Sequence, residues 1–221
     1  MPTHNKERPI LFSGPMIRAI LENRKCQTRR VVKKAIPDES FINAPYNGFA
    51  FVGQFNGGTY TVPFLCPYGQ PGDRLWVRET FKNVVSGSIG WDGSGALRYG
   101  FGYAADNAVA WHDMPTQIHG GDKTDPLQFH PQKWKPSIHM PRRASRITLE
   151  ITNVRVERLQ DISEADARAE GAREVDWEYD NGECPESCKE AFECLWNHIN
   201  GPDSWAANPW VWVIEFKRVT L

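Results

Sequence analysis

The stretch Glu22-Asn23-Arg24-Lys25-Cys26-Gln27-Thr28-Arg29-Arg30 places an amine, a hydroxyl and several guanidinium groups close together in the chain. No other stretch of the sequence offers as many groups that can grip an anion or act on a carbonyl. We therefore expect the rest of the fold to present this stretch. An acidic partner should then come from further along the chain.

A short helix is predicted to run into this stretch. Ser13-Gly14-Pro15 is typical of a helix start, because Ser can cap the first turn and Pro is tolerated within it. The apolar residues that follow have helical spacing and predict one buried face: Met16, Ile17, Ile20 and Leu21. We expect the helix to end near Asn23, a residue that tolerates the left-handed conformation common at helix ends.

A strand is predicted directly afterwards, over residues 28–32. Side chains alternate along a strand, so Thr28 and Arg30 should point to the same side. Lys25 lies just before them, at the turn from helix to strand. This arrangement predicts that the three side chains converge on one concavity. The alternative is a basic turn on the protein surface.

The composition indicates one sizeable domain of 221 residues whose net charge of −1 shows no excess that would indicate nucleic acid. The charges are nevertheless unevenly distributed. Residues 18–34 and 126–149 are basic, and residues 157–193 are strongly acidic. The two basic segments would form a positive patch if they met in space. The alternative is that each is a solvated face.

A cytoplasmic protein without a membrane partner is expected. The sequence has no apolar run approaching the roughly 18 residues of a membrane span, and no basic and apolar leader precedes Pro9. The odd number of cysteines, 5, favours a reducing compartment over a disulfide framework. Most of the 9 tryptophans are expected to anchor core and loops. Trp91 and Trp134 are candidates for stacking on a base.

No metal or cofactor is expected. Cys184, Cys188 and Cys194, followed by His198, lack the usual paired spacing of zinc ligands, and Cys66 is the one remote candidate for a fourth ligand. The chain contains no P-loop, no dinucleotide-binding fingerprint, no G-x-S-x-G and no H-E-x-x-H.

The rest of the chain predicts strands and loops with few helices. Residues 33–66 predict β-hairpins with loops, and residues 82–140 predict a long irregular insertion with one strand near 97–103. Three further strands are expected, at 74–81, at 146–159 with a bend near Asn153, and at 210–216.

Two helices are expected in the acidic part of the chain. Ser163, with Asp166 three residues later, predicts the capped start of a short helix over 164–170, which Gly171 should end. A second helix is predicted at about 185–199, with an apolar face formed by Phe192, Leu195, Trp196 and Ile199.

Glu170 lies in the last turn of the short helix, where the helix dipole disfavours a carboxylate. It is either ordinary surface variation or a functional acid. A Thr hydroxyl needs a base to become a nucleophile, and a Lys whose pKa is lowered by burial and neighbouring arginines can be that base. A Glu can then move a proton to a leaving amine. Lys25, Thr28 and Arg30, together with an acid from a distant part of the chain, would thus supply the groups for such chemistry.

Four separated pieces of the chain resemble the ASCH domain family, whose fold is similar to the PUA RNA-binding β-barrel. They are residues 20–30, the turn Gly72-Asp73-x-Leu75, residues 159–171 and the closing strand at 210–217. The segments Cys66-Pro67-Tyr68-Gly69 and Asn208-Pro209-Trp210 are similar to those of longer members that phages and prophages often encode.

The resemblance implies specific roles. Small bacterial members are N4-acetylcytidine amidohydrolases, and their catalytic Lys, Thr and Glu match Lys25, Thr28 and Glu170. Their nearby Arg matches Arg30. Further candidate substrate contacts are Arg29, Arg78 and Trp76. The chain departs from the family in having Asn23 where Gly is usual, and in its additions at about 33–66 and 82–140.

We therefore expect one mixed α+β domain over residues 1–221, a PUA-like (ASCH) β-barrel with flanking short helices and two long insertions. The expected activity is hydrolysis of the amide of an N4-acylated cytidine-type nucleoside or modified base. The alternatives are a module that binds RNA or single-stranded nucleic acid, and a ribonuclease. Whether the ligand is a free nucleoside or a polymer is left open by the sequence.

Overall fold

The computed structural model describes residues 6–33, 42–44, 48–55, 58–86, 98–112, 133–173 and 185–219. Trp91 and Cys184, which the sequence analysis singled out, lie outside these residues. The described part is a mixed α+β structure with one five-stranded sheet and two three-stranded sheets. This confirms the predicted fold class at its coarse level.

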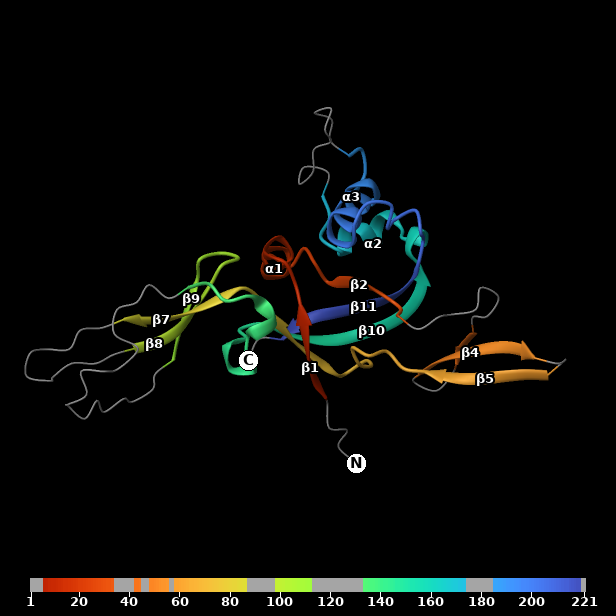
Figure 1. Ribbon diagram of the computed structural model, residues 1–221, viewed down its shortest axis with the longest axis horizontal. Coiled ribbons are helices and arrows are strands. Elements are labelled where there is room, and N and C mark those ends of the chain that lie inside the picture. Colours follow the sequence, from red (N-terminus) through yellow and green to blue (C-terminus); the bar gives the residue numbers. More distant parts are fainter. Residues whose placement is uncertain are drawn as a thin grey trace, which may run out of the picture. The chain divides into compact units, whose positions relative to one another are not determined.

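The five-stranded sheet has the order β1-β6-β10-β11-β2 (Figure 1). Its strands are β1 (Glu7–Leu11), β6 (Arg74–Arg78), β10 (Thr148–Arg158), β11 (Trp210–Val219) and β2 (Gln27–Val31). β11 pairs antiparallel with both β10 and β2. Among the described strands β1 and β2 are the two edges of this sheet, so it is open and not the closed barrel that the family resemblance predicted.

The long strand β10 has the predicted irregularity. Its register against β11 shifts between Ile151 and Asn153, next to the residue at which the apolar alternation changes phase in the sequence. The extra residue bends the strand, as β-bulges do. β11 runs three residues beyond the predicted end at Phe216 and reaches Val219.

The chain divides into two compact units. The first comprises the residues up to Arg8, Ala19–Leu75 and Ile147–Leu221, and the second comprises Pro9–Arg18 and Trp76–Arg146. Strands β1 and β6 begin in the first unit, and the chain continues from each into the second.

In the first unit, α2 (Glu164–Ala169) and α3 (Cys188–Asn200) cover one face of the sheet at β11 (Figure 1). The core there combines Val211 and Val213 of β11 with apolar residues of the helices and their connections, including Leu159, Ile162, Ala167, Phe192 and Trp196. Ile199 was predicted to join this face but is 50% exposed. It lies in the last turn of α3, three residues beyond Trp196, the last buried residue of the helix.

The first unit also contains the sheet β3-β4-β5, formed by Ile42–Ala44, Gly48–Phe55 and Gly58–Phe64. β4 pairs antiparallel with β5 over their full length, so the hairpin predicted within 33–66 is confirmed.

In the second unit, β7 (Phe81–Ser86), β8 (Arg98–Tyr103) and β9 (Val109–His112) form an antiparallel sheet. β8 confirms the strand predicted near 97–103. The strand predicted over 74–81 was wrong in its extent, because β6 ends at Arg78 and a new strand begins at Phe81. Between them Glu79 is buried and accepts two hydrogen bonds of 2.9 Å from the Arg146 guanidinium. A small core of Phe81, Tyr103, Met140 and Ala144 packs nearby.

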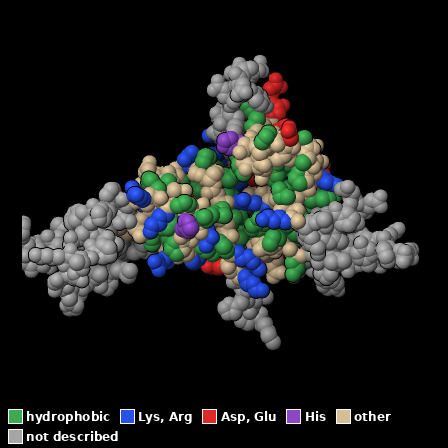
Figure 2. All heavy atoms as spheres, in the orientation of Figure 1, with side chains coloured by type: hydrophobic (Ala, Val, Ile, Leu, Met, Phe, Trp, Pro, Cys, Tyr) green, Lys and Arg blue, Asp and Glu red, His purple; other side chains and the backbone are tan. Residues whose placement is uncertain are grey.

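None of the helices in the described ranges is long and apolar enough to cross a membrane. Figure 2 shows lysine and arginine side chains interspersed with hydrophobic ones on the visible face of the molecule.

Candidate active site

The turn that follows α1 (Gly14–Leu21) brings Lys25 into the interior of the first unit. Asn23 has the predicted left-handed conformation, with φ of 57°. The chain then folds back, and the backbone N–H groups of Arg24 and Lys25 both donate to the Ala19 carbonyl, over 2.8 and 3.0 Å. These bonds satisfy the end of the helix in the manner of a left-handed cap. As a result the Lys25 side chain is completely buried.

Glu170 is placed by the C-terminal end of α2. The helix begins as predicted, with the Ser163 hydroxyl accepting a hydrogen bond from the Asp166 N–H over 3.1 Å. It ends at Glu170, and Gly171 follows with φ of 82°. The Cys26 N–H donates to the Ala169 carbonyl over 2.9 Å, which ties the turn containing Lys25 to this helix end. Two segments about 145 residues apart therefore lie side by side.

Lys25 and Glu170 form a buried ion pair. Lys25 Nζ lies 2.7 Å from Glu170 Oε2 and also donates to the Glu170 backbone carbonyl over 2.8 Å. Only 2% of the Glu170 side chain is exposed. Desolvation lowers the pKa of Lys25 below its ordinary value, and it outweighs the opposite effect of the Glu170 carboxylate. The charges of Arg30 and Arg29 lower this pKa further.

Arg29 holds the other oxygen of the same carboxylate. Its Nη1 donates to Glu170 Oε1 over 3.2 Å, while its Nη2 contacts Glu157 and lies 3.4 Å from Asp166 Oδ2. The Arg29 side chain is fully buried. The structure thus places Arg29, predicted as a substrate contact, inside an ion-pair network where it orients Glu170.

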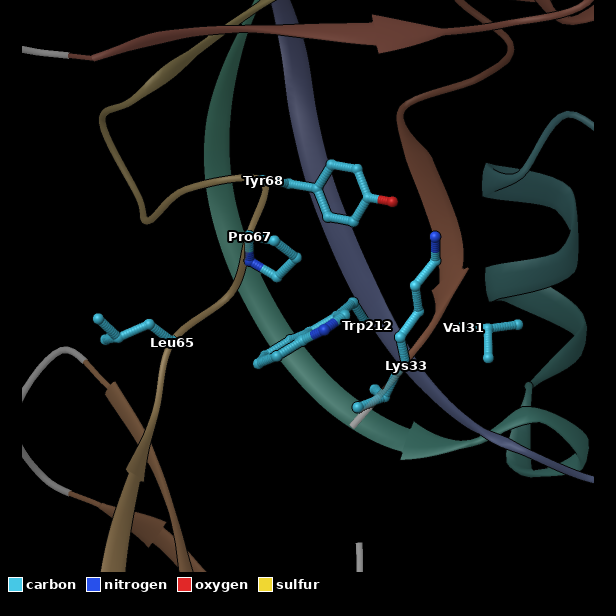
Figure 3. Close-up of a pocket in the computed structure, with 7 residues that line it drawn as sticks. Val31, Lys33, Leu65, Pro67, Tyr68 and Trp212 are labelled. Atoms are coloured by element: carbon cyan, nitrogen blue, oxygen red, sulfur yellow. The ribbon is translucent and has the colours of Figure 1, made fainter. Parts of the chain in front are cut away.

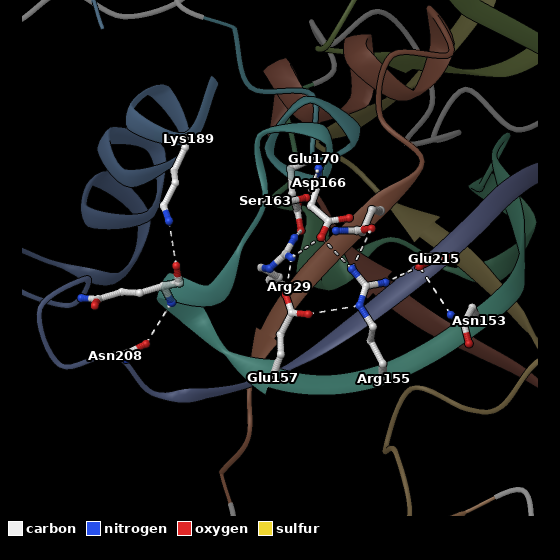
Figure 4. A network of polar contacts seen from close by, with 12 residues as sticks. Arg29, Asn153, Arg155, Glu157, Ser163, Asp166, Glu170, Lys189, Asn208 and Glu215 are labelled. Carbon is white, nitrogen blue, oxygen red and sulfur yellow. Dashed lines mark hydrogen bonds and ion pairs between the residues drawn. The ribbon is translucent and has the colours of Figure 1, made fainter. Parts of the chain in front are cut away.

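This network continues across the sheet, as Figure 4 shows. Arg155 of β10 donates to Asp166 over 3.0 Å and to Glu157 over 3.1 Å, and it also contacts Glu215 of β11. In the amide orientation that satisfies both of its ends, Gln27 donates to Asp166 Oδ1 over 3.1 Å and accepts from Arg29. Several shared hydrogen bonds and ion pairs of this kind fix one geometry, with Arg29 Nε as a buried atom that has no hydrogen-bond partner among the described residues.

Thr28 and Arg30 point to the opposite side of β2 from Arg29, because side chains alternate along a strand. Thr28 is opposite Ile214 and Arg30 is opposite Trp212 on β11. Thr28 is 2% exposed, and its hydroxyl forms no hydrogen bond with the residues that the structure describes.

Arg30 lies within electrostatic reach of two other groups of the first unit. Desolvation lowers the pKa of its guanidinium, while the charges of Tyr68 and Glu170 raise it. β2 is the edge strand of the sheet, and Glu170 lies beside it, so one carboxylate interacts with side chains from both faces of the strand. The structure thus brings Lys25 into contact with Glu170 and places Arg30 within electrostatic range of both, whereas Thr28 forms no hydrogen bond with them.

A hollow with a volume of about 400 Å³ opens on the face of the sheet to which Arg30 points (Figure 3). This volume lies within the range of roughly 300–1,000 Å³ typical of small-molecule sites. Trp212 and Tyr68 contribute aromatic rings, and Lys33 contributes an ammonium group. The other lining residues are Val31, Val32, Leu65 and Pro67.

The two remaining predicted contacts, Trp76 and Arg78, belong to the second unit. There the Arg78 guanidinium stacks over the Trp76 ring at 4.7 Å from its centroid. Trp76 is mostly buried.

Sequence reasoning missed several residues of the candidate site. Glu157 and Arg155 carried no signal beyond strand alternation, and Asp166 was recognised only as a capping residue. Tyr68 and Trp212 could have been found only from the register of β11 against β2 and from the course of residues 65–69, which are tertiary facts.

Comparison of the chain with family models, with curated proteins and with solved structures finds no match. The site geometry and its chemistry therefore carry the functional conclusion.

Proposed function

We propose that the chain is an ASCH-type, PUA-like protein and that it hydrolyses the amide of an N4-acylated cytidine-type nucleoside or modified base. One observation carries the proposal: a Lys and a Glu form a buried pair at 2.7 Å whose Lys has a lowered pKa. Desolvated titratable groups with perturbed pKa values are typical of acid–base sites. The mixed α+β fold is compatible with this assignment.

In the first proposed step, the Thr28 hydroxyl attacks the carbonyl carbon of the acyl group. Lys25 in its neutral form accepts the hydroxyl proton, and its lowered pKa makes that form accessible. The Arg30 guanidinium stabilises the negative charge that develops on the carbonyl oxygen. No hydrogen bond joins the Thr28 hydroxyl to Lys25 Nζ in the structure, so this step requires that substrate binding bring the two groups within hydrogen-bond distance.

In the second step, the C–N bond breaks and the proton taken by Lys25 is passed to the leaving amine. Glu170, hydrogen-bonded to Lys25, relays it. Cytidine departs and the acyl group remains on Thr28 as an ester. Water then attacks the ester, with Lys25 again as base, and releases the carboxylic acid and the free hydroxyl. Arg29 keeps the Glu170 carboxylate in place throughout.

The sharpest test is Thr28→Val, which removes the hydroxyl at nearly constant shape. We expect the rate of cytidine release from N4-acetylcytidine to fall on the order of 10³-fold or more. Thermal unfolding should change little, because the hydroxyl has no hydrogen-bond partner among the described residues. Thr28→Ser should retain measurable turnover, and Thr152→Val, on the exposed side of β10, is the matched control.

If the wild-type protein releases no cytidine from a panel of N4-acylated cytidines, the proposed activity is wrong. Unchanged turnover in Thr28→Val would instead leave the activity but exclude Thr28 as the nucleophile.

A second candidate function is a module that binds RNA or single-stranded nucleic acid. Trp134 favours it, because this ring is 42% exposed and carries the Lys82 ammonium 4.5 Å from its centroid. An exposed aromatic ring beside a cation is suited to stacking on a base. Oligonucleotide binding that weakens steeply with salt, in a protein without turnover, would support this alternative.

A further inference from the structure

We infer that the hollow beside Arg30 binds a pyrimidine 5′-mononucleotide, so that the preferred ligand carries a phosphate. The inference rests on the proposed function, since it names the substrate class of the same site. Its first support is shape. Figure 3 shows the half-buried Tyr68 ring and the Trp212 ring, which is only 1% exposed, beside one hollow, and the volume of this hollow, about 400 Å³, suits a single nucleotide.

Arg30 connects this hollow with the candidate catalytic groups. It is directly opposite Trp212 in the strand register, and its charge interacts with both Tyr68 and Glu170. A base stacked on the Tyr68 ring would therefore lie near Arg30, whose charge also interacts with Glu170. An aromatic side chain stacks on the face of such a base, and this contact tolerates substituents on the edge of the base.

Lys33 is the residue that we expect to bind the phosphate group of the ligand. It follows the end of β2, and Figure 3 shows its ammonium group within the hollow. Lys33 is exposed and forms no ion pair with any residue that the structure describes. None of the described residues that line the hollow is acidic. A solvated cation that has no counter-ion among the described residues and lies within a base-sized hollow suits one phosphate group.

The same lining argues against a polymer as the main ligand. Single-stranded nucleic acid is held by a groove with several cations that follow the backbone and several stacking platforms. Among the described residues that line this hollow, Lys33 is the one cation, and the partly exposed ring, Tyr68, can stack on one base. The arrangement therefore matches one nucleotide unit.

The test is calorimetric binding of cytidine and of cytidine 5′-monophosphate to the full chain. We expect the monophosphate to bind about tenfold more tightly, as one charge-assisted contact predicts. Lys33→Gln should abolish this difference and leave cytidine binding unchanged. Lys217→Gln removes an exposed ammonium that pairs with Glu150 elsewhere in the first unit, and it should retain the difference.

Tyr68 tests the stacking surface. Tyr68→Leu should weaken both ligands about tenfold, and Tyr68→Phe, which keeps the ring, should restore most of the affinity. Unfolding curves show whether each variant is folded. If Tyr68→Leu does not fold, the affinity of Tyr68→Phe is compared with that of the wild type instead. Equal affinity of the wild type for the two ligands, or tighter binding of an oligocytidine than of the monophosphate, would overturn the inference.

Turnover is measured separately, with N4-acetylcytidine and its 5′-monophosphate as substrates. If the monophosphate binds in a manner that depends on Lys33 but neither substrate is turned over, the inference is supported and the proposed activity is wrong. If both substrates are turned over with equal kcat/KM and Lys33→Gln changes neither value, the proposed activity is supported and the inference is wrong.

Discussion

At the scale of single residues, Lys25 is the most unusual group of the described structure. A buried ammonium loses its hydration, and the Glu170 carboxylate and carbonyl replace only part of it. The positive charges of Arg29 and Arg30 add to the cost of the charged form. Such a lysine binds its proton less firmly than an exposed one, which is the property that a general base requires.

Lys25→Met tests this directly through the pH dependence of stability. The unfolded chain protonates Lys25 near its ordinary pKa of 10.5, and the folded protein does so at a lower pKa. Between these two values the unfolded state binds more protons, so the free energy of unfolding of the wild type should rise with pH. Urea denaturation over the alkaline range should show this rise, and the Met variant should lack it.

Lys217→Met is the matched control for that experiment, because it removes an ammonium that is 63% exposed. Its unfolding free energy should follow the wild-type slope. Identical slopes in the wild type and in Lys25→Met would contradict the lowered pKa of Lys25.

At the scale of elements, the end of α2 positions the acid. Gly171 has φ of 82°, and a Cβ atom there would lie 3.1 Å from the Ala19 Cβ and 3.2 Å from the Lys25 Cβ. The glycine thus permits both the left-handed turn after Glu170 and the close approach of the turn that carries Lys25. Two local turns are packed against each other, and their contact creates the ion pair.

Gly171→Ala should therefore destabilise the protein by about 2 kcal/mol, from the left-handed backbone and the crowded Cβ together. Gly201→Ala is a matched control, since Gly201 also has positive φ, 100°, but an added Cβ would meet nothing within 4 Å. Gly201→Ala should lower the free energy of unfolding only through the strained backbone conformation, by about 1 kcal/mol. Chemical denaturation measures both, and equal losses would show that the contact with Ala19 and Lys25 is not tight.

At the scale of the whole molecule, the chain leaves and re-enters the first unit twice, and long-range polar contacts hold its segments together. Asp73 is one such contact within that unit. Its carboxylate accepts hydrogen bonds from the Lys6 and Gln70 N–H groups, over 3.0 and 3.2 Å, and from Arg8 over 2.8 Å. Desolvation alone would raise the pKa of Asp73, but these bonds outweigh it and lower the pKa.

This predicts how stability falls in acid. Because the folded pKa of Asp73 is below its ordinary value of 3.8, its contribution is fully present above that pH and is lost as pH falls through the folded pKa. Asp73→Asn should lower the free energy of unfolding at neutral pH by about 1–3 kcal/mol and flatten its decline below about pH 4. Asp203→Asn, at an exposed position, should keep the wild-type decline in urea titrations across this range.

The local features of this protein follow from the amino-acid sequence alone. The start of α2 at Ser163, the left-handed Asn23, the bulge beside Asn153 and the shared side of Thr28 and Arg30 all follow from interactions between residues a few positions apart. Hydrogen bonds in caps and turns, and the alternation of strands, act over this short range, so a single sequence contains them.

The remaining features depend on tertiary contacts. The burial of Lys25, the place of Arg29 on the opposite face in a network with Glu157 and Asp166, and the open edge of the sheet depend on segments more than a hundred residues apart. The same holds for the hollow between Tyr68 and Trp212. Strand register and helix packing set these contacts, and both are fixed by the sum of many long-range burials that no local pattern encodes.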